Sequence, residues 1–273
     1  IYNMIINDKN VLLTPTYQIT KEDIVNYYSL VSKKMMPFLD NRLISTVRAP
    51  NGLHNDIFFM KHFNNKNLSK KIINNNDRKL DYYYIKNEQG IIDEVQMNSY
   101  EFHIWGSKQN SINHPDILIF DLDPDDKLNI NKVREGVKDL KSILDKLKLK
   151  SFLKTSGGKG YHIYVPLETS SWKKTESIAE NIANLMIERN PDKYTTNMRK
   201  QNRKNKIFID YYRNKKGATS VCPYSLRLKK GATVSCPIYW KELYTIKPTD
   251  ITIKNIKDRL KKDPWKNFFK TKK

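Results

Sequence analysis

The chain has 273 residues, of which 38% are hydrophobic, so it can bury a core in one large domain or two small ones. Fifty Lys and Arg oppose 29 Asp and Glu, and the formal net charge of +21 favours an anionic partner such as nucleic acid, nucleotide or acidic lipid. No apolar run approaches the roughly 18 residues that span a bilayer, and the N-terminus lacks a signal-peptide pattern. We therefore expect a soluble, intracellular protein, and the hydrophobic content argues against a disordered chain.

The cysteine content argues against a zinc site. Cys222 and Cys236 belong to no CxxC motif or Cys/His cluster, and we expect both to be small buried hydrophobic residues. The chain begins with Ile rather than Met, which suggests a module cut from a longer protein.

The first part of the chain predicts one helix and several strands. Thr20 and Asp23 resemble a capping box, and apolar residues follow at helical spacing until Pro37, where we expect the helix to stop. Strands are predicted over RLISTVRAP (42–50), DIFFMKH (56–62) and LDYYYIK (80–86), and the basic, Asn-rich stretch 64–79 predicts an exposed loop.

Two further helices are predicted in the second part. Apolar residues recur at helical spacing over 133–147 and over 178–186, and the second helix should end before Pro191. Both helices are expected to cover a sheet. The chain has no internal repeat and no Pro- or Ser-rich linker, so a subdomain boundary is placed near residue 115 by inference alone.

The stretch ILIFDLDPDD, residues 117–126, puts four carboxylates behind a short apolar run that predicts a buried strand. Strand alternation places Asp121 and Asp123 on one face, roughly 6.5 to 7 Å apart along the backbone. A Mg²⁺ or Mn²⁺ ion would neutralise such a pair and also hold a phosphate. The alternative is a solvated turn, which we prefer for Asp125 and Asp126, whereas we favour the metal for the other two.

A third carboxylate would strengthen a metal site, because two-metal sites need several acids. Asp210 interrupts a second β-like run over 207–212, and Arg213 follows three residues later. Taken alone, Asp210 could as easily pair with a nearby lysine.

The stretch KTSGGKGYHIYVPL, residues 154–167, places a Gly-rich turn between two β-like segments. It is not a Walker A loop, because a strand and not a helix follows it. An ordinary hairpin turn is the alternative, and the glycines alone would favour it. Ser156, Lys159 and His162 favour a phosphate site, because their side chains can donate to phosphate oxygens while the glycines let backbone N–H groups approach.

Other residues suit a triphosphate or a nucleic acid. Arg213 and Arg227, on β-like segments, could hold phosphates or form surface ion pairs, and the sequence leaves these readings even. The basic segment 198–206 could follow a phosphate backbone, although such runs are more often simply solvated. Phe58 and Phe59 could stack on a base, but adjacent strand residues point oppositely, so we expect at least one in the core.

Several motifs taken together resemble one family. They are HIWGS (103–107), HPDILIFDLDP (114–124), KTSGGKGYHIYVPL (154–167), YTTNMRKQNRKNKIFIDYYRN (194–214) and GATSVCPYSLRLKKGATVSCPIYW (217–240). They resemble the polymerase domain of the bacterial and archaeal non-homologous end-joining system, the ligase D (LigD) polymerase domain, within the archaeo-eukaryotic primase superfamily. The resemblance implies an α+β primase-polymerase fold, with an RRM-like catalytic β-sheet flanked by helices and a smaller N-terminal α/β part. We expect an N-terminal segment at 1–19, this domain at 20–262 and a basic C-terminal tail at 263–273.

The resemblance also assigns site residues. It implies that Asp121, Asp123 and Asp210 are catalytic and bind two divalent ions, Mg²⁺ or Mn²⁺. The implied nucleotide-binding residues are His103, Ser156, Lys159, Gly160, His162, Arg213 and Arg227. The alternative for His103 is that it caps the strand beside Trp105. Residues implied to contact DNA or stack on bases are Phe58, Phe59 and Lys61, while Lys9 or Lys21 could bind a 5′-phosphate, although the N-terminus diverges from the family.

The implied activity is that of a DNA-directed nucleotidyltransferase (EC 2.7.7) of double-strand-break repair. It would fill short gaps and ends from NTPs with a preference for ribonucleotides. The implied partners are DNA ends and gaps with a 5′-phosphate, NTP or dNTP, Ku and an ATP-dependent DNA ligase, fused or separate. The implied location is the nucleoid-associated cytoplasm of a prokaryote.

Two other functions are weighed against this one. A haloacid-dehalogenase-like phosphatase would use Asp121 as nucleophile, but that family continues Gly-Thr where this chain has Pro124 and Asp125. A non-catalytic nucleic-acid-binding module would use only the basic surface, and the loss of a metal-binding aspartate would favour it. All three aspartates are present.

Overall fold

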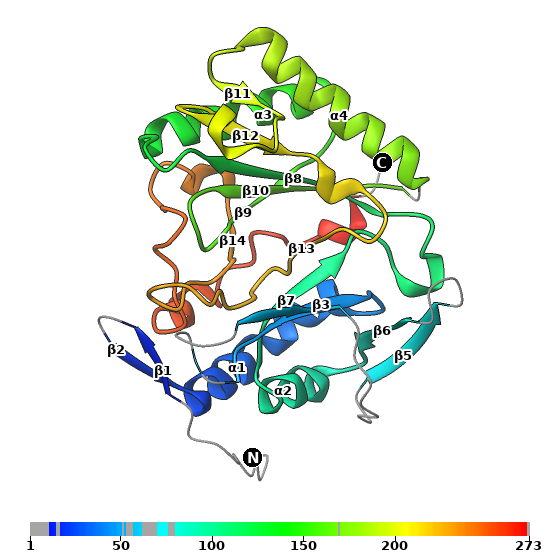
Figure 1. Cartoon of the computed structure of the whole chain (residues 1–273), viewed down its shortest axis with the longest axis vertical. Helices are drawn as coiled ribbons and strands as arrows, with labels where there is room; N and C mark the ends of the chain where they lie inside the picture. The colour runs from blue at the N-terminus through cyan, green and yellow to red at the C-terminus, as the bar shows by residue number, and fades with distance from the viewer. Residues whose placement is uncertain are drawn as a thin grey trace. The chain divides into compact units, whose positions relative to one another are not determined.

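The structure is a computed structural model that describes residues 11–14, 17–50, 52, 57–61, 70–75, 80–168 and 170–271 (Figure 1). The chain forms two compact units, each assembled from separate stretches of sequence. Unit 1 comprises Ile1–Ile104, Val221–Ser235 and Ile251–Leu260, and unit 2 comprises Trp105–Ser220, Cys236–Asp250 and Lys261–Lys273.

The first helix of unit 1, α1 (Lys21–Leu39), begins at the predicted capping box. Thr20 Oγ1 accepts the Asp23 N–H at 3.1 Å, and the Asp23 carboxylate accepts the Thr20 N–H at 2.8 Å. The prediction that the helix stops at Pro37 was wrong. A proline removes one backbone donor, and the turn around it is still closed because the Asp40 N–H donates to the Met36 carbonyl at 2.7 Å.

The strands of unit 1 include the three that the sequence predicts: β3 (Ile44–Arg48), β4 (Phe58–Met60) and β6 (Leu80–Ile85). Strand β3 lies between β4 and β7 (Ser99–Trp105) and is antiparallel to both. The predicted loop at 64–79 was wrong for β5 (Lys70–Asn75), which pairs antiparallel with β6, because backbone ladder bonds form irrespective of polar composition. The unit also contains the hairpin of β1 (Val11–Thr14) and β2 (Tyr17–Thr20), and an unpredicted helix, α2 (Glu88–Gln96).

Unit 2 is built on a six-stranded sheet in the order β11-β12-β8-β10-β9-β14. Its strands are β8 (Ile117–Pro124), β9 (Phe152–Thr155), β10 (Tyr161–Pro166), β11 (Tyr194–Thr195), β12 (Ile207–Asp210) and β14 (Pro237–Ile238). Adjacent strands are antiparallel except for β11 and β12. The two predicted helices are confirmed as α3 (Ile130–Lys146) and α4 (Trp172–Arg189), which lie together on one side of this sheet (Figure 1).

Short elements complete the described fold. Strand β13 (Thr219–Val221) lies where the chain passes from unit 2 to unit 1. The 3₁₀ helices are Gln109–Ser111, Lys200–Arg203, Tyr212–Asn214, Trp240–Glu242, Ile256–Arg259 and Phe268–Lys270. None of the helices described in the structure is long and apolar enough to cross a membrane.

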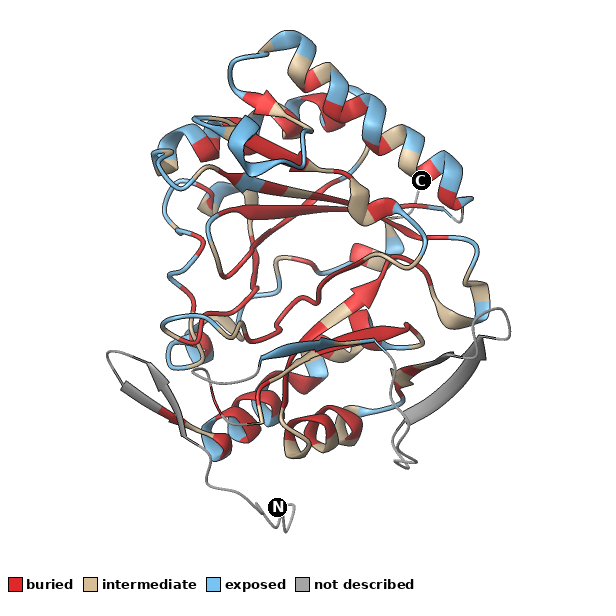
Figure 2. Ribbon diagram, in the orientation of Figure 1, coloured by how far each residue is buried: buried red, intermediate tan, exposed pale blue. Residues whose placement is uncertain are grey.

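The distribution of burial follows the predicted amphipathic pattern (Figure 2). Every residue of β10 is buried, and the helices of unit 2 bury one side while exposing the other. Cys222 and Cys236 are buried, as expected. The C-terminal segment contributes two aromatic residues to the core of unit 2, because Trp265 stacks on Phe268 and its Nε1–H donates to the Leu153 carbonyl at 2.8 Å.

Candidate active site

Four polar side chains form a row across the sheet of unit 2, one on each of four neighbouring strands. The register places Asp210 on β12 opposite Asp121 on β8, Asp121 opposite His162 on β10, and His162 opposite Lys154 on β9. Directly opposed residues of antiparallel strands share a face of the sheet, so all four side chains lie on one face. The fold thus brings together three residues that the sequence predicts and adds Lys154, which it missed.

Arg213 connects the two aspartates of this row. Its Nε lies 3.0 Å from Asp210 Oδ2 and 3.7 Å from Asp121 Oδ2. The prediction that Arg213 lies on a β segment was wrong, because β12 ends at Asp210 and a 3₁₀ turn follows. The Asp210 carboxylate itself promotes that turn by accepting the Tyr212 N–H at 3.1 Å, which returns the arginine to the strand end.

Asp123 lies two residues beyond Asp121 on the same face of β8, and its side chain is 52% exposed. Arg203 Nη1 is 3.4 Å from Asp123 Oδ2, and the guanidinium of Arg203 lies over the ring of Phe208, the register partner of Asp123. The neighbouring acids have other roles, since Asp125 accepts the Asn205 N–H at 2.6 Å.

Neighbouring side chains shift the pKa values of the two partly buried aspartates in opposite directions. Burial raises the pKa of Asp121, but His162, Arg213 and Lys154 outweigh burial and hold this pKa well below its usual range. Burial also raises the pKa of Asp210, the negative charge of Asp121 adds to the rise, and Arg213 offsets only part of it. Asp121 is therefore firmly ionised, and Asp210 is protonated first as the pH falls.

The donor set suits a hard divalent cation, because carboxylate oxygens are the ligands that Mg²⁺ and Mn²⁺ prefer. Asp121 and Asp210 already approach one cationic atom, Arg213 Nε, from two strands. Within the described ranges, however, no three His, Cys, Asp or Glu side chains form a ready-made metal-binding group. Metal binding by Asp121, Asp123 and Asp210 therefore stays a prediction.

The Gly-rich turn between β9 and β10 is organised by Ser156, whose Oγ accepts the N–H groups of Gly158 at 3.0 Å and Gly160 at 3.2 Å. A Cβ atom at Gly160 would lie 1.9 Å from the Leu122 carbonyl oxygen, so the close approach of this turn to β8 requires glycine. Lys159 is exposed at the turn and pairs with Asp126.

A second group of predicted residues lies in unit 1 around Glu101, which the sequence reasoning missed. Glu101 Oε2 lies 3.0 Å from His103 Nε2 and 3.2 Å from Arg227 Nε, and Oε1 accepts the Leu228 N–H at 2.6 Å. The ring of His103 also meets Phe59 edge-on, with centroids 5.2 Å apart. Arg227 lies in an irregular segment beside a single β-bridge, not on the strand that was predicted.

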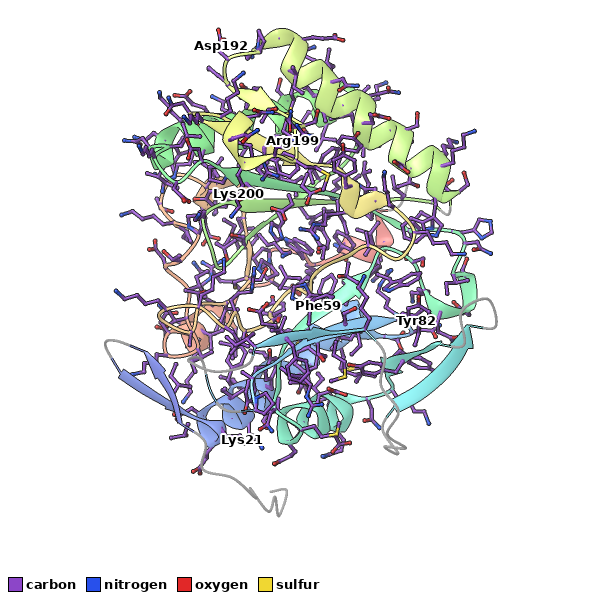
Figure 3. All side chains as sticks on the ribbon, in the orientation of Figure 1. Lys21, Phe59, Tyr82, Asp192, Arg199 and Lys200 are labelled. Atoms are coloured by element: carbon purple, nitrogen blue, oxygen red, sulfur yellow. The ribbon has the colours of Figure 1, made fainter. Side chains whose placement is uncertain are left out.

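The predicted DNA-contacting residues lie at the edge strand β4. Phe58 and Phe59 are 43% and 45% exposed, so the expectation that one is in the core was wrong, because a three-residue edge strand leaves both faces open. Lys61, directly after β4, is also exposed. Lys21, which is labelled in Figure 3, lies at the start of α1. It is buried instead, and its Nζ donates to the Gln96 carbonyl at 2.7 Å. Lys9 lies outside the described residues.

Glu101 should make the stability of the protein depend on pH. Burial raises the pKa of Glu101, but His103, Arg227 and the Leu228 N–H overcome burial and lower it from an ordinary value near 4.5 to about 2. An acid with a depressed pKa stabilises the fold above its unfolded pKa and loses that effect as the pH falls through the folded pKa. Glu101→Gln should therefore lower the free energy of unfolding by about 3 kcal/mol at pH 6, and by much less near pH 2.

Urea denaturation at a series of pH values checks this prediction. Glu135→Gln is the matched control, because Glu135 is an exposed acid paired with Lys193 at 3.6 Å. A difference between wild type and Glu101→Gln that stays constant from pH 6 to pH 2 would show that the Glu101 carboxylate is not held ionised by its neighbours.

Comparisons with known proteins identify the family. The family model described as "LigD, primase-polymerase domain" matches residues 20–265. The chain is 32% identical over 268 residues to the multifunctional non-homologous end joining protein LigD of Pseudomonas aeruginosa, with 94% of this chain and 32% of that protein covered. It is 30% identical over 257 residues to the bifunctional LigD of Bacillus subtilis, with 92% and 42% covered. The chain therefore spans less than half the length of these two relatives.

A solved structure supports the same conclusion. The polymerase domain of Mycobacterium tuberculosis ligase D, in complex with DNA, matches with a TM-score of 0.88 and 25% sequence identity, and the match covers 98% of this chain and 99% of that chain. This likeness confirms the α+β primase-polymerase fold that the motifs predicted. The match to this family model argues against the alternative of a haloacid-dehalogenase-like phosphatase, in which Asp121 would be a nucleophile. The chain belongs to the LigD primase-polymerase domain family.

Proposed function

We propose that this chain is a DNA-directed nucleotidyltransferase that extends DNA ends and fills short gaps from nucleoside triphosphates by two-metal phosphoryl transfer. The observation that carries the proposal is the row of Asp210, Asp121 and His162 across one sheet face, with Asp123 beside it, in a member of this family. The solved relative's complex with DNA supports DNA as the partner.

Asp121, Asp123 and Asp210 would hold two divalent ions, Mg²⁺ or Mn²⁺. When bound, such ions lower the pKa of a primer 3′-hydroxyl and neutralise charge on the transferred phosphate. The low pKa of Asp121 supports its role, because a carboxylate that stays ionised needs no deprotonation before it binds a cation. Arg213, which faces both aspartates, can turn its guanidinium to phosphate oxygens that arrive with the nucleotide.

The remaining predicted residues receive binding roles in this proposal. Ser156, Lys159, Gly160, His162 and Arg213 are proposed to contact the triphosphate. His103 and Arg227 are also proposed to bind nucleotide, and both side chains pair with Glu101. Phe58 and Phe59 offer two exposed aromatic faces on which bases can stack, and Lys61 adds a positive charge beside them.

The proposed repair pathway is supported by the two relatives, which are named as non-homologous end joining proteins. We propose that this chain acts in double-strand-break repair with Ku and an ATP-dependent DNA ligase, at 5′-phosphorylated gaps and ends in a prokaryotic cytoplasm, and that it prefers ribonucleotides. Its net charge of +21 supports association with DNA.

Primer extension on a gapped duplex with a downstream 5′-phosphate tests the proposal. We expect extension that requires Mg²⁺ or Mn²⁺ and that is faster with ribonucleoside than with deoxyribonucleoside triphosphates. Lys159→Ala should mainly raise the KM for the nucleotide, because its exposed ammonium is proposed to contact phosphate. Tight DNA binding by a folded protein without any extension would instead favour a non-catalytic nucleic-acid-binding module.

A further inference from the structure

Lys154, the member of the row on β9, is buried and contacts His162. Lys154 is fully buried in the middle of β9, and its Nζ lies 2.8 Å from Nδ1 of His162. The other ring nitrogen of His162, Nε2, lies 3.2 Å from Asp121 Oδ1. The imidazole therefore has one nitrogen beside an ammonium group and the other beside a carboxylate.

The chemistry of these groups gives the two contacts a direction. An ammonium group has three donors and no acceptor, so Nδ1 must accept from Lys154 and carries no proton. The neutral ring then holds its proton on Nε2, which donates to Asp121. We infer that Lys154 is a positioning residue that fixes His162 as the Nε2–H tautomer and aims this donor toward the aspartates.

The charges around the row support an ammonium at Lys154. A buried cation is costly unless nearby groups compensate its charge. Two groups compensate Lys154: the ionised Asp121, which contacts the other side of the His162 ring, and the ring of Tyr164, whose centroid lies 5.2 Å from Nζ. With Arg213 included, the row contains two carboxylates, two cationic side chains and the imidazole of His162, so its formal charges cancel when the imidazole is neutral. Because no part of Lys154 reaches the surface, it acts through His162 and does not itself meet a nucleotide.

The consequence for nucleotide binding rests on the proposed function. His162 would present a donor to a carboxylate or phosphate oxygen as a neutral ring, without taking up a second proton. Without the ammonium, either tautomer of the ring becomes accessible, and in one of them Nε2 is an acceptor that faces anions. Loss of one hydrogen bond to a charged group should weaken nucleotide binding by roughly tenfold or more.

The tautomer can be measured directly in the unmodified chain. Long-range ¹H–¹⁵N correlation spectra of protein labelled with ¹⁵N-histidine distinguish protonated from unprotonated ring nitrogens, and His162→Gln identifies the His162 signals. We expect a neutral ring with its proton on Nε2. A proton on Nδ1 would overturn the inference. This outcome is independent of polymerase activity, so a failure of the proposed function would not be mistaken for it.

Lys154→Met supplies the second arm of the test, and Lys262→Met is its control. Lys262 is an exposed lysine of unit 2 whose Nζ donates to Glu242 Oε1 at 3.0 Å, so its substitution removes the same charge away from His162. Lys154→Met should yield mixed tautomers of His162 and roughly tenfold weaker binding of ATP with Mn²⁺ and without DNA, whereas Lys262→Met should change neither. An unchanged His162 spectrum in folded Lys154→Met would also overturn the inference. If Lys154→Met does not fold, the spectrum of the wild-type chain decides the question.

Discussion

Asp210→Asn and Asp121→Asn should both abolish nucleotide incorporation, yet change the stability of the protein in opposite directions. Each substitution removes one carboxylate from the proposed metal-binding set. Since bound metal ions contribute several kcal/mol of charge stabilisation in a transition state, incorporation should fall by at least about a thousandfold. Primer extension under saturating nucleotide measures this loss.

The opposite effects on stability follow from the two pKa shifts. The pKa of Asp210 is raised, so the fold favours its neutral form, and a neutral Asn should leave the free energy of unfolding at pH 7 unchanged or higher. The pKa of Asp121 is lowered, so the fold favours its charge, and Asn there should lower the free energy of unfolding. Urea denaturation without divalent metal separates these cases.

Asp145→Asn is the matched control for both variants. Asp145 is an exposed acid of α3 that pairs with Lys141 at 2.5 Å, so its substitution should alter neither stability nor incorporation appreciably. DNA affinity should be retained in all three variants, because each one removes negative charge from a basic protein. If Asp210→Asn instead lost DNA binding, stability and incorporation together, its role would be structural and the two-metal proposal would be wrong.

The sequence predicted the strand that carries Asp121 and Asp123 because a short run of four apolar residues is a local signal of a buried strand. The row itself was not predictable in the same way. It depends on the register of β8 against β10 and β12, which is set by the packing of segments far apart in the chain. Local patterns singled out His162 and Asp210, and the family resemblance assigned their roles, but neither placed them opposite Asp121.

Two further residues of the candidate site, Lys154 and Glu101, were not predicted from the sequence. Lysine is rarely fully buried, so a lysine in an apolar strand is expected at an edge or at the surface. Only the fold shows that Lys154 is buried beside His162. Glu101 could have been found, because alternation puts it on the same face as His103, two residues later on β7. Arg213 was predicted as a site residue, but on a strand. The turn that positions it depends on a hydrogen bond to the Asp210 side chain, and the strand periodicity of the sequence does not reveal such a turn.

Gly160→Ala should be among the most damaging substitutions of the turn, although it adds only one carbon atom. The new Cβ would lie 1.9 Å from the Leu122 carbonyl oxygen and 3.1 Å from the Pro124 side chain, and a strand carbonyl held in a ladder cannot move aside without shifting β8. Overpacking typically costs about 1 to 3 kcal/mol in the free energy of unfolding, and we expect the upper end of this range here because the contact is with a backbone atom. Thermal and urea denaturation measure this cost.

The same clash should reduce activity beyond the loss of folded protein, because Leu122 stands between Asp121 and Asp123 and any shift of its carbonyl moves both aspartates. Gly106→Ala is the matched control, since its Cβ would meet the Ile117 carbonyl oxygen at 3.4 Å and the Trp172 ring at 3.5 Å, which are ordinary contacts. Incorporation should be assayed at a temperature where both variants are folded, and only Gly160→Ala should be impaired. Equal stability of the two variants would show that the turn can move away from β8 at little cost and that the predicted clash at Gly160 was wrong.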